Sequence, residues 1–331
     1  MRTKIWWIVV ILNVLQACSI GASGVNRNEF IDKEIRDEMK ELNDRFLKAI
    51  ASKDFAKVRS FMSDELLKTA SKKEMDSLMT QLMAPIQSDK YRILDQYYVS
   101  NLNSGVQNIL TSNKDSENAY KIVYKALDRE MYTVILIPEG QVHDVMIMAI
   151  YGKTSKGWKI NILNFGQYKI FHKTASEYYK LAKEAYHHSE MIDAVSYISM
   201  AKNCSTPGGK NFIYNSTPEI NEFYDQVMKE ANKQYSLPKT LSNIPSKPKL
   251  FRVYPEVFDD GVFPMVNYVS KIDFDDTITL RLEYEQVKSE VNGLFSGINR
   301  NKKYVLYRAY NEMPDGVKTV NYYGFVDKVE K

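Results

Sequence analysis

The sequence predicts an α+β protein made of three successive parts. Residues 35–82 carry three amphipathic helical patterns, and residues 91–165 carry runs of alternating polar and apolar side chains that are typical of strands. A second helical stretch covers 171–235, and residues 250–331 again combine strand and helix patterns. A chain of 331 residues is long enough for two or three domains, each with its own core.

Composition and charge are those of an ordinary folded protein. Hydrophobic residues make up 44% and charged residues 26% of the chain, which excludes a wholly disordered chain. The formal charge of +4 falls by two when the basic residues of the leader, Arg2 and Lys4, are left out. Lysine and arginine form no cluster with interleaved aromatic residues, so we expect no nucleic acid partner.

The first seventeen residues predict a secretory signal peptide over 1–17. Arg2 and Lys4 give it a basic start, the apolar run Ile5–Leu15 follows, and small residues come at the end. The apolar run has about eleven residues, whereas a membrane-spanning helix needs about 20. We therefore expect a cleaved leader rather than a transmembrane helix.

The end of this leader resembles the lipobox of bacterial lipoproteins. The sequence reads Leu-Gln-Ala-Cys up to Cys18, with Gln16 where a small residue is commoner. The resemblance implies cleavage before Cys18 and lipidation of its thiol, which would attach the chain to a membrane through acyl chains. Ser19, with no acidic run after it, implies by the same resemblance an outer-membrane lipoprotein of the bacterial cell envelope that faces the periplasm. Residues 18–29 are small and polar, and they predict a flexible tether.

Three helices are predicted next, over Ile35–Ile50, Ser52–Met62 and Ser71–Leu82. In each, apolar residues recur at steps of three and four, so that they line one face. Ser71 and Glu74 form the sequence signature of a capping box at the start of the third helix. Because each helix has only one apolar face, all three need a sheet to cover.

Strand patterns that follow these helices supply that sheet. Short runs of β-branched and aromatic residues alternate with polar ones, and the segment 152–157, which begins and ends with glycine, indicates a hairpin. The predicted strands, which we expect to be antiparallel, are Tyr91–Ser100, Tyr120–Leu127, Met131–Ile137, Val142–Tyr151 and Trp158–Phe165.

Three helices followed by a sheet resemble the NTF2-like superfamily, in the form of a DUF3887-type domain. The sequence Lys53-Asp54-Phe55, which precedes a hydrophobic helix, carries part of this likeness. The resemblance implies an NTF2-like domain over 30–170, in which three helices pack on a curved antiparallel sheet and enclose a cone-shaped cavity.

Residues 171–235 predict a helical hairpin followed by one more helix. Its small residues Ala182, Ala194 and Ala201 let two helices approach closely, and in this respect the region resembles one tetratricopeptide hairpin. No second copy follows at the required period, so a lone hairpin docked on the sheet domain is the simpler interpretation.

Residues 236–249 are rich in proline, serine and lysine and predict a linker. Beyond them, 250–331 predict a small C-terminal α+β module. Its expected helix begins after Asp275 or Asp276, and its last two strands, Tyr304–Tyr310 and Val317–Val326, are joined through a Pro-Asp-Gly turn.

Three residues are candidates for catalysis, namely Asp95, His143 and Asp128. The first two are predicted in the middle of strands and the third at a strand end. Enzymes of the family that the chain resembles use a carboxylate or a histidine inside the cone as general base, and apolar walls would raise the pKa of such a carboxylate. The alternative is that strand alternation places these residues on the solvated face.

Neither a metal site nor a cofactor site is predicted. The chain has two cysteines, Cys18 and Cys204, which form no metal-binding pair and no disulfide framework. Nothing near Cys204 indicates an activated thiol, so we expect it to be buried or idle.

The sequence thus favours a non-catalytic, lipid-anchored platform with an envelope protein as its partner. Two alternatives stay open. One is a small-molecule-binding protein whose cavity, lined by Tyr97 and Tyr124, takes a small apolar ligand; the other is a cone-fold isomerase or dehydratase that uses Asp95 or His143. A filled cavity would argue against both.

Overall fold

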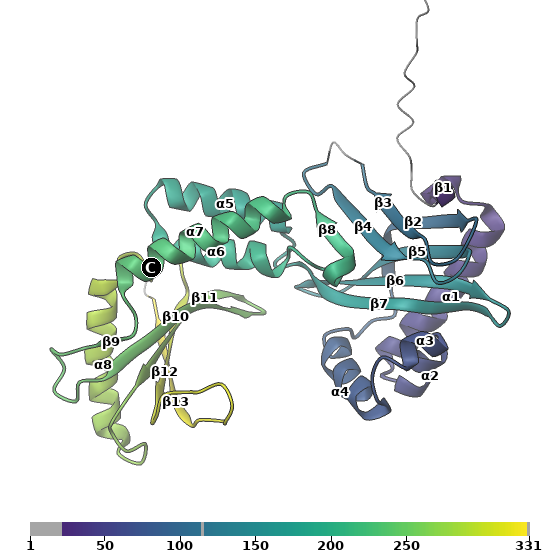
Figure 1. Cartoon of the computed structure of the whole chain (residues 1–331). Helices are drawn as coiled ribbons and strands as arrows, with labels where there is room; N and C mark the ends of the chain where they lie inside the picture. The colour runs from purple at the N-terminus through teal and green to yellow at the C-terminus, as the bar shows by residue number, and fades with distance from the viewer. Residues whose placement is uncertain (1–21, 114–115, 330–331) are drawn as a thin grey trace, which may run out of the picture.

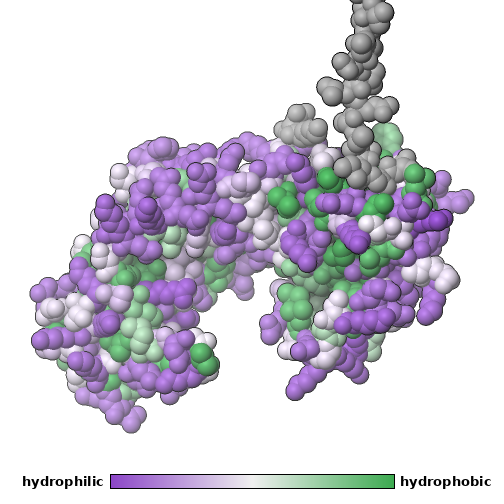
Figure 2. Space-filling view, viewed as in Figure 1, coloured by the Kyte–Doolittle hydropathy of each residue, from purple (hydrophilic) through white to green (hydrophobic). Residues whose placement is uncertain are grey.

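The computed structural model describes residues 22–113 and 116–329, which form two lobes joined by a helical bridge (Figure 1). These residues contain eight α-helices and three β-sheets, none of which closes into a barrel. The space-filling view shows an open gap between the lobes beneath the bridge (Figure 2). The α+β class that the sequence predicts is therefore confirmed, with an arch-like arrangement of its parts.

The N-terminal lobe places four helices on one face of a five-stranded sheet. Side chains at the N-cap positions accept hydrogen bonds from the first turn of these helices. The Asp32 carboxylate accepts from the backbone N–H of Glu34, and Ser71 with Glu74 forms the predicted capping box. The helices are α1 (Lys33–Ala51), α2 (Phe55–Ser60), α3 (Asp64–Leu67) and α4 (Lys72–Met83).

This sheet, the central sheet, is antiparallel throughout, in the order β1-β2-β5-β6-β7. Its middle strands β5 and β6 are buried on both faces, which explains their nearly continuous apolar sequences. The predicted hairpin joins β6 to β7. The strands are β1 (Ala22–Arg27), β2 (Tyr91–Asn101), β5 (Glu130–Pro138), β6 (Asp144–Thr154) and β7 (Gly157–Lys169).

A second, three-stranded sheet lies against the face of the central sheet opposite the helices. It consists of β3 (Gln107–Thr111), β4 (Tyr120–Lys125) and β8 (Phe212–Tyr214), in the order β3-β4-β8. We call it the covering sheet. Its apolar residues share one core with the central sheet and the bridge, so the central sheet is covered on both sides.

The bridge consists of α5 (Ala175–His187), α6 (Met191–Asn203) and α7 (Thr217–Tyr235). Ala182, Ala194 and Ala201 are fully buried, as close packing of α5 against α6 requires. Two short 3-10 turns, η1 (Asn28–Phe30) and η2 (Gly209–Asn211), lie just before α1 and β8 respectively.

The C-terminal lobe packs one helix, α8 (Thr277–Leu294), on a five-stranded sheet. The Asp276 carboxylate caps this helix by accepting from the backbone of Thr279 at 3.0 Å, as predicted. The sheet order is β13-β12-β11-β10-β9, and α8 is the crossover between the parallel strands β11 and β12. The strands are β9 (Lys239–Thr240), β10 (Lys249–Phe258), β11 (Gly261–Val269), β12 (Tyr304–Tyr310) and β13 (Tyr322–Lys328).

The structure differs from the sequence-based expectations in two connecting segments. The tether predicted over 18–29 ends by residue 22, because Ala22–Arg27 form β1 and pair with β2. The linker predicted over 236–249 contributes β9, and it buries Leu241 and Ile244 in the C-terminal core. Both segments join the edge of a sheet through backbone hydrogen bonds, and such pairing needs no hydrophobic periodicity in the sequence. Their composition therefore suggested a flexible chain.

Candidate functional site

The three candidate catalytic residues do not share a site. Asp95 lies on β2, opposite Ile135 of β5. His143 lies in the turn between β5 and β6 rather than in the middle of a strand, and Asp128 lies in the loop before β5. Because β5 and β6 are antiparallel neighbours, these two residues are at opposite ends of that strand pair.

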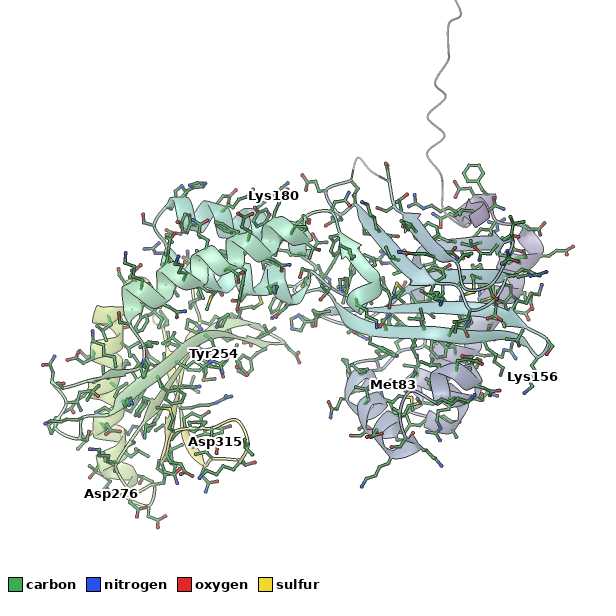
Figure 3. All side chains as sticks on the ribbon, viewed as in Figure 1. Met83, Lys156, Lys180, Tyr254, Asp276 and Asp315 are labelled. Atoms are coloured by element: carbon green, nitrogen blue, oxygen red, sulfur yellow. The ribbon has the colours of Figure 1, made fainter. Side chains whose placement is uncertain are left out.

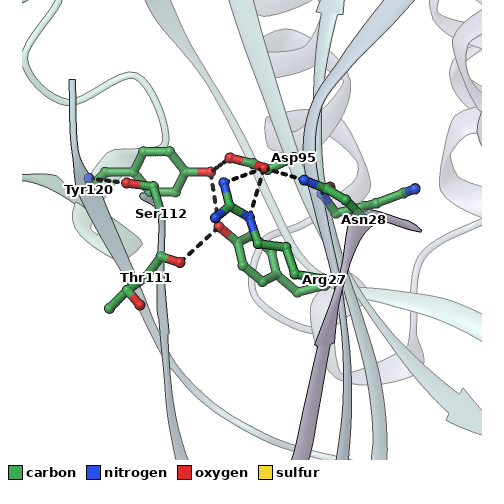
Figure 4. A network of polar contacts seen from close by, with 8 residues as sticks. Arg27, Asn28, Asp95, Thr111, Ser112 and Tyr120 are labelled. Carbon is green, nitrogen blue, oxygen red and sulfur yellow. Dashed lines mark hydrogen bonds and ion pairs between the residues drawn. The ribbon is translucent and has the colours of Figure 1, made fainter. Parts of the chain in front are cut away.

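Asp95 is the centre of a buried polar network that ties β1 to the central sheet (Figure 4). Its Oδ1 accepts from Arg27 Nε at 3.0 Å, from Arg27 Nη2 at 2.7 Å and from Asn28 Nδ2 at 2.8 Å. Its Oδ2 accepts from the hydroxyl of Tyr120. Asp95 is only 5% exposed, and both oxygens are engaged. The arrangement fastens the N-terminal strand and leaves no free oxygen to take a substrate proton.

The electrostatics of this network keep Arg27 charged and its two tyrosines protonated. Burial alone would lower the pKa of Arg27, but the hydrogen bond to Asp95 and the charges of its neighbours together outweigh this effect, and the net shift is upward. Burial raises the pKa of Tyr97 to about 12 and the pKa of Tyr120 further still. A guanidinium and a carboxylate thus neutralise each other beside two protonated phenols, which is a stable structural arrangement.

The interior in which the sequence predicts a ligand cavity is packed with side chains. Tyr97 and Tyr124 are 1% and 3% exposed. The Tyr97 hydroxyl donates to the Thr111 carbonyl at 3.3 Å, and Tyr124 accepts from Asn108 Nδ2 at 3.2 Å. Their neighbours in the same core include Leu110, Ile122, Met148 and Phe212. The covering sheet therefore fills the space that these tyrosines were predicted to line.

Asp128 holds the end of the central sheet together. Its Oδ2 accepts from Asn161 Nδ2 on β7 at 2.8 Å. Gly152 of β6 lies directly beneath, where a Cβ would overlap both polar groups. This contact gives the carboxylate a structural partner and accounts for a glycine in that strand.

His143 lies at the rim of a polar cleft between the lobes. Its Nδ1 accepts from the Phe171 backbone N–H at 3.3 Å, and its ring lies edge-on to the ring of Phe171. The cleft is also lined by Lys90 of the N-terminal lobe and by Asp259 of the β10–β11 turn. A base needs a second group to orient it toward a substrate, and the hydrogen-bond partner of this imidazole is a backbone amide.

An apolar cavity lies elsewhere, where the bridge meets the C-terminal lobe. Its volume is about 60 Å³. Figure 3 labels Tyr254, which lines it from β10 beneath the bridge. Its apolar lining comes from α6, α7, β10, β11 and the end of α8, and includes Val195, Met228, Ala231, Val253, Pro264 and Phe295. Sequence reasoning missed this site because residues about 100 positions apart form it.

Ion pairs hold this joint closed on one side. Lys302 Nζ lies 2.5 Å from Asp193 Oδ1 of α6, and both side chains are nearly buried. Arg300 pairs with Glu190 just before the same helix. The C-terminal lobe is therefore fixed to the bridge by charge pairs around an apolar contact.

Cys204 is fully buried at the end of α6, as expected from its surroundings in the sequence. Burial raises the pKa of its thiol to about 12, so it is protonated and unreactive at neutral pH. Within residues 22–113 and 116–329, no three His, Cys, Asp or Glu side chains are grouped so as to hold a metal ion. No helix in that part of the chain has the length and apolar character needed to span a membrane.

The predicted lipidation site, Cys18, lies outside the described residues. Comparison with known proteins adds no relative: no family model, no curated protein and no solved structure matches the chain.

Proposed function

We propose that this chain is a non-catalytic, lipid-anchored protein of the bacterial envelope that serves as a binding or assembly platform. Lipid on Cys18 attaches it to the outer membrane with its lobes in the periplasm. We also propose that residues 30–170 are an NTF2-like domain of the DUF3887 type. Its helices α1 to α4 lie on one face of the antiparallel central sheet, of which β2, β5, β6 and β7 fall within this range, and helices packed on such a sheet resemble the cone of that superfamily.

The observation that carries the proposal is the filled interior of the N-terminal lobe. Tyr97 and Tyr124 pack in a continuous core. Both carboxylate oxygens of Asp95 accept hydrogen bonds, from Arg27, Asn28 and Tyr120. A cone-fold isomerase or dehydratase needs an open pocket with a carboxylate or histidine that can reach the substrate. The packed core and the paired carboxylate argue against that alternative and favour recognition at the surface.

The start of β1 sets how far the platform can stand from its anchor. Three residues separate Cys18 from Ala22, where β1 begins. At about 3.5 Å per extended residue, Ala22 lies no more than about 14 Å from the acylated cysteine. Because Arg27 and Asp95 fasten β1 to the central sheet, the lobe itself is held close to the membrane surface.

Fractionation of two cysteine variants tests the anchor. Cells that express the full chain, Cys18→Ser or Cys204→Ala are separated into membrane and soluble fractions. We expect the parent and Cys204→Ala in the membrane fraction and Cys18→Ser in the soluble fraction. Cys204→Ala controls for the loss of a thiol as such. If Cys18→Ser stays with the membranes as the parent does, the lipid anchor is refuted.

A second candidate function is supported by the cavity at the joint. At about 60 Å³ it has room for a short alkyl chain, and a ligand there would contact both the bridge and the C-terminal lobe. n-Butanol should then raise the melting temperature of the full chain but not that of Ala231→Phe, whose new side chain fills the space. Equal shifts in both proteins would exclude ligand binding at this cavity.

A further inference from the structure

An exposed apolar patch on the C-terminal lobe has no partner within the described residues. Ile278 and Leu282 of α8 are 76% and 62% exposed, and Val326 of β13 is 63% exposed. Tyr323 extends the patch along β13. We call these four residues the α8–β13 patch. A cleft of about 550 Å³ runs between the helix and the strand. Single exposed apolar residues are ordinary, but a group of four along one cleft indicates an interface.

β13 is the edge strand of its sheet, and among the described residues no strand pairs with its outer side. Natural proteins protect such edges with charges, proline or very short strands. β13 has seven residues, and its first five, Tyr-Tyr-Gly-Phe-Val, include neither charge nor proline. Its acidic residue, Asp327, turns toward Lys288 of α8 at 3.2 Å. The free edge therefore offers a row of backbone groups with which another extended strand can pair.

If two molecules are related by a two-fold axis beside β13, the unpaired backbone groups of β13 in one molecule can hydrogen-bond to β13 of the other. Two copies of β13 would pair antiparallel, and the exposed Ile278 and Leu282 of each copy would meet apolar surface on the other. Arg281, which lines the cleft, has no carboxylate partner within the described residues. Further along the helix, Glu285 and Asp327 share Lys288 at 3.1 and 3.2 Å, so this group keeps one net negative charge. Antiparallel α8 helices bring these opposite charges toward each other. The patch is thus complementary to itself in backbone pattern and charge.

We propose that a second copy of this chain covers the α8–β13 patch, with the two β13 strands paired antiparallel across a two-fold axis. The dimer joins two C-terminal sheets into one continuous sheet and leaves both N-terminal lobes free. It requires no ligand and is independent of whether Cys18 carries lipid.

Disulfide trapping in the full chain tests the pairing of the strands. Tyr322→Cys, Gly324→Cys and Val326→Cys are expressed one at a time and oxidised in isolated membranes. Cys204 is buried and does not compete. Because antiparallel strands bring only positions near the axis face to face, one of the three variants should form a covalent dimer far more efficiently than the others.

Ile109→Cys is the matched control, because Ile109 is 59% exposed on β3, the edge strand of the covering sheet. It should give no covalent dimer. Equal trapping at Ile109 and on β13 would mean random collision and would overturn the proposal. So would the absence of trapping at all three β13 positions, or a trapped product that contains a different protein.

Sedimentation of the detergent-extracted full chain tests the apolar part of the patch. Leu282→Glu should weaken dimerisation at least tenfold, whereas Leu78→Glu, at a 55% exposed position on α4, should not. Arg281→Glu should weaken it as well, and adding Glu285→Arg should restore it. Circular dichroism confirms that each variant folds. A monomeric parent at tens of micromolar, or a Leu282→Glu chain that dimerises as the parent does, would refute the second copy.

Discussion

The two lobes treat their sheets in opposite ways. In the N-terminal lobe, helices cover one face of the central sheet, and the covering sheet and the bridge cover the other. β5 and β6 are buried along almost their whole length. In the C-terminal lobe α8 covers one face only, and β13 is exposed at nearly every position.

The contrast separates residues that maintain the fold from residues that are free to recognise something else. Polar groups in the interior of the N-terminal lobe, such as Asp95 and Tyr120, hydrogen-bond to each other. The C-terminal lobe leaves apolar side chains and a strand edge without internal partners. We therefore propose that recognition takes place on the C-terminal lobe, while the N-terminal lobe provides a rigid base.

The largest expected difference in the free energy of unfolding is between shortening a buried side chain on β5 and shortening an exposed one on β13. Ile135→Ala removes a fully buried side chain and should lower the free energy of unfolding by about 2–5 kcal/mol. Val326→Ala, at a 63% exposed position, should change it by less than about 0.5 kcal/mol in dilute protein.

Urea titration with two probes measures both changes. Trp158 is the only tryptophan after residue 7 and is buried in the N-terminal core, so its fluorescence reports that lobe alone. Circular dichroism reports the whole chain. A large cost for Val326→Ala in dilute protein would mean that β13 is less exposed in the monomer than the structure indicates.

The second comparison is between ion pairs. Asp95→Ala leaves Arg27 and the Tyr120 hydroxyl without their acceptor in a nearly buried site, and should cost about 2–4 kcal/mol. The loss is smaller than that of a fully buried pair because Arg27 is 34% exposed and solvent screens its charge. Asp327→Ala, which removes one of the two carboxylate partners of the 30% exposed Lys288, should cost less than about 1 kcal/mol. Equal losses of stability in the two variants would show that the network around Asp95 is not a structural fastening.

Glycine positions give the third comparison. A Cβ at Gly166 of β7 would overlap the backbone carbonyl of Pro207, so Gly166→Ala should lower the free energy of unfolding by about 1–3 kcal/mol. Gly324 of β13 has open space around it, and Gly324→Ala should be neutral or stabilise the monomer by up to about 1 kcal/mol. The midpoint of thermal unfolding should fall in Gly166→Ala and stay the same or rise in Gly324→Ala. A Gly166→Ala chain as stable as the parent would contradict the close approach of β7 to the loop that contains Pro207.

Local sequence patterns predicted most helices and strands because their periodicity is set by neighbours along the chain. The capping box of Ser71 and Glu74, the β6–β7 hairpin and the Asp276 cap are interactions within a few residues, and all are confirmed. β10 and β1 were not predicted, since each depends on pairing with a distant strand rather than on its own alternation.

The candidate site depended on contacts that no local pattern reveals. Asp95 reads as a lone acid on a strand, and its partners Arg27 and Tyr120 are 68 and 25 residues away. The cavity at the joint combines residues of the bridge and of the C-terminal lobe. A pattern can place a carboxylate on a strand, but only the tertiary structure shows whether its lone pairs are free.

The smallest expected effect concerns the thiol of Cys204, which packs in the core shared by the bridge and the N-terminal lobe. Its pKa is raised by burial to about 12 in the folded chain, against about 8.5 when unfolded. Between these values the folded chain keeps a proton that the unfolded chain has lost, so the stability that this proton contributes falls as the pH rises from about 9 to 12. Between pH 9 and pH 10 the parent should lose about 1 kcal/mol more stability than Cys204→Ala, because tyrosine titration is common to both proteins. The difference should appear in the Trp158 transition, since that signal follows the lobe against which Cys204 packs. Parallel losses in the two proteins would mean that the thiol is accessible to water in the native state.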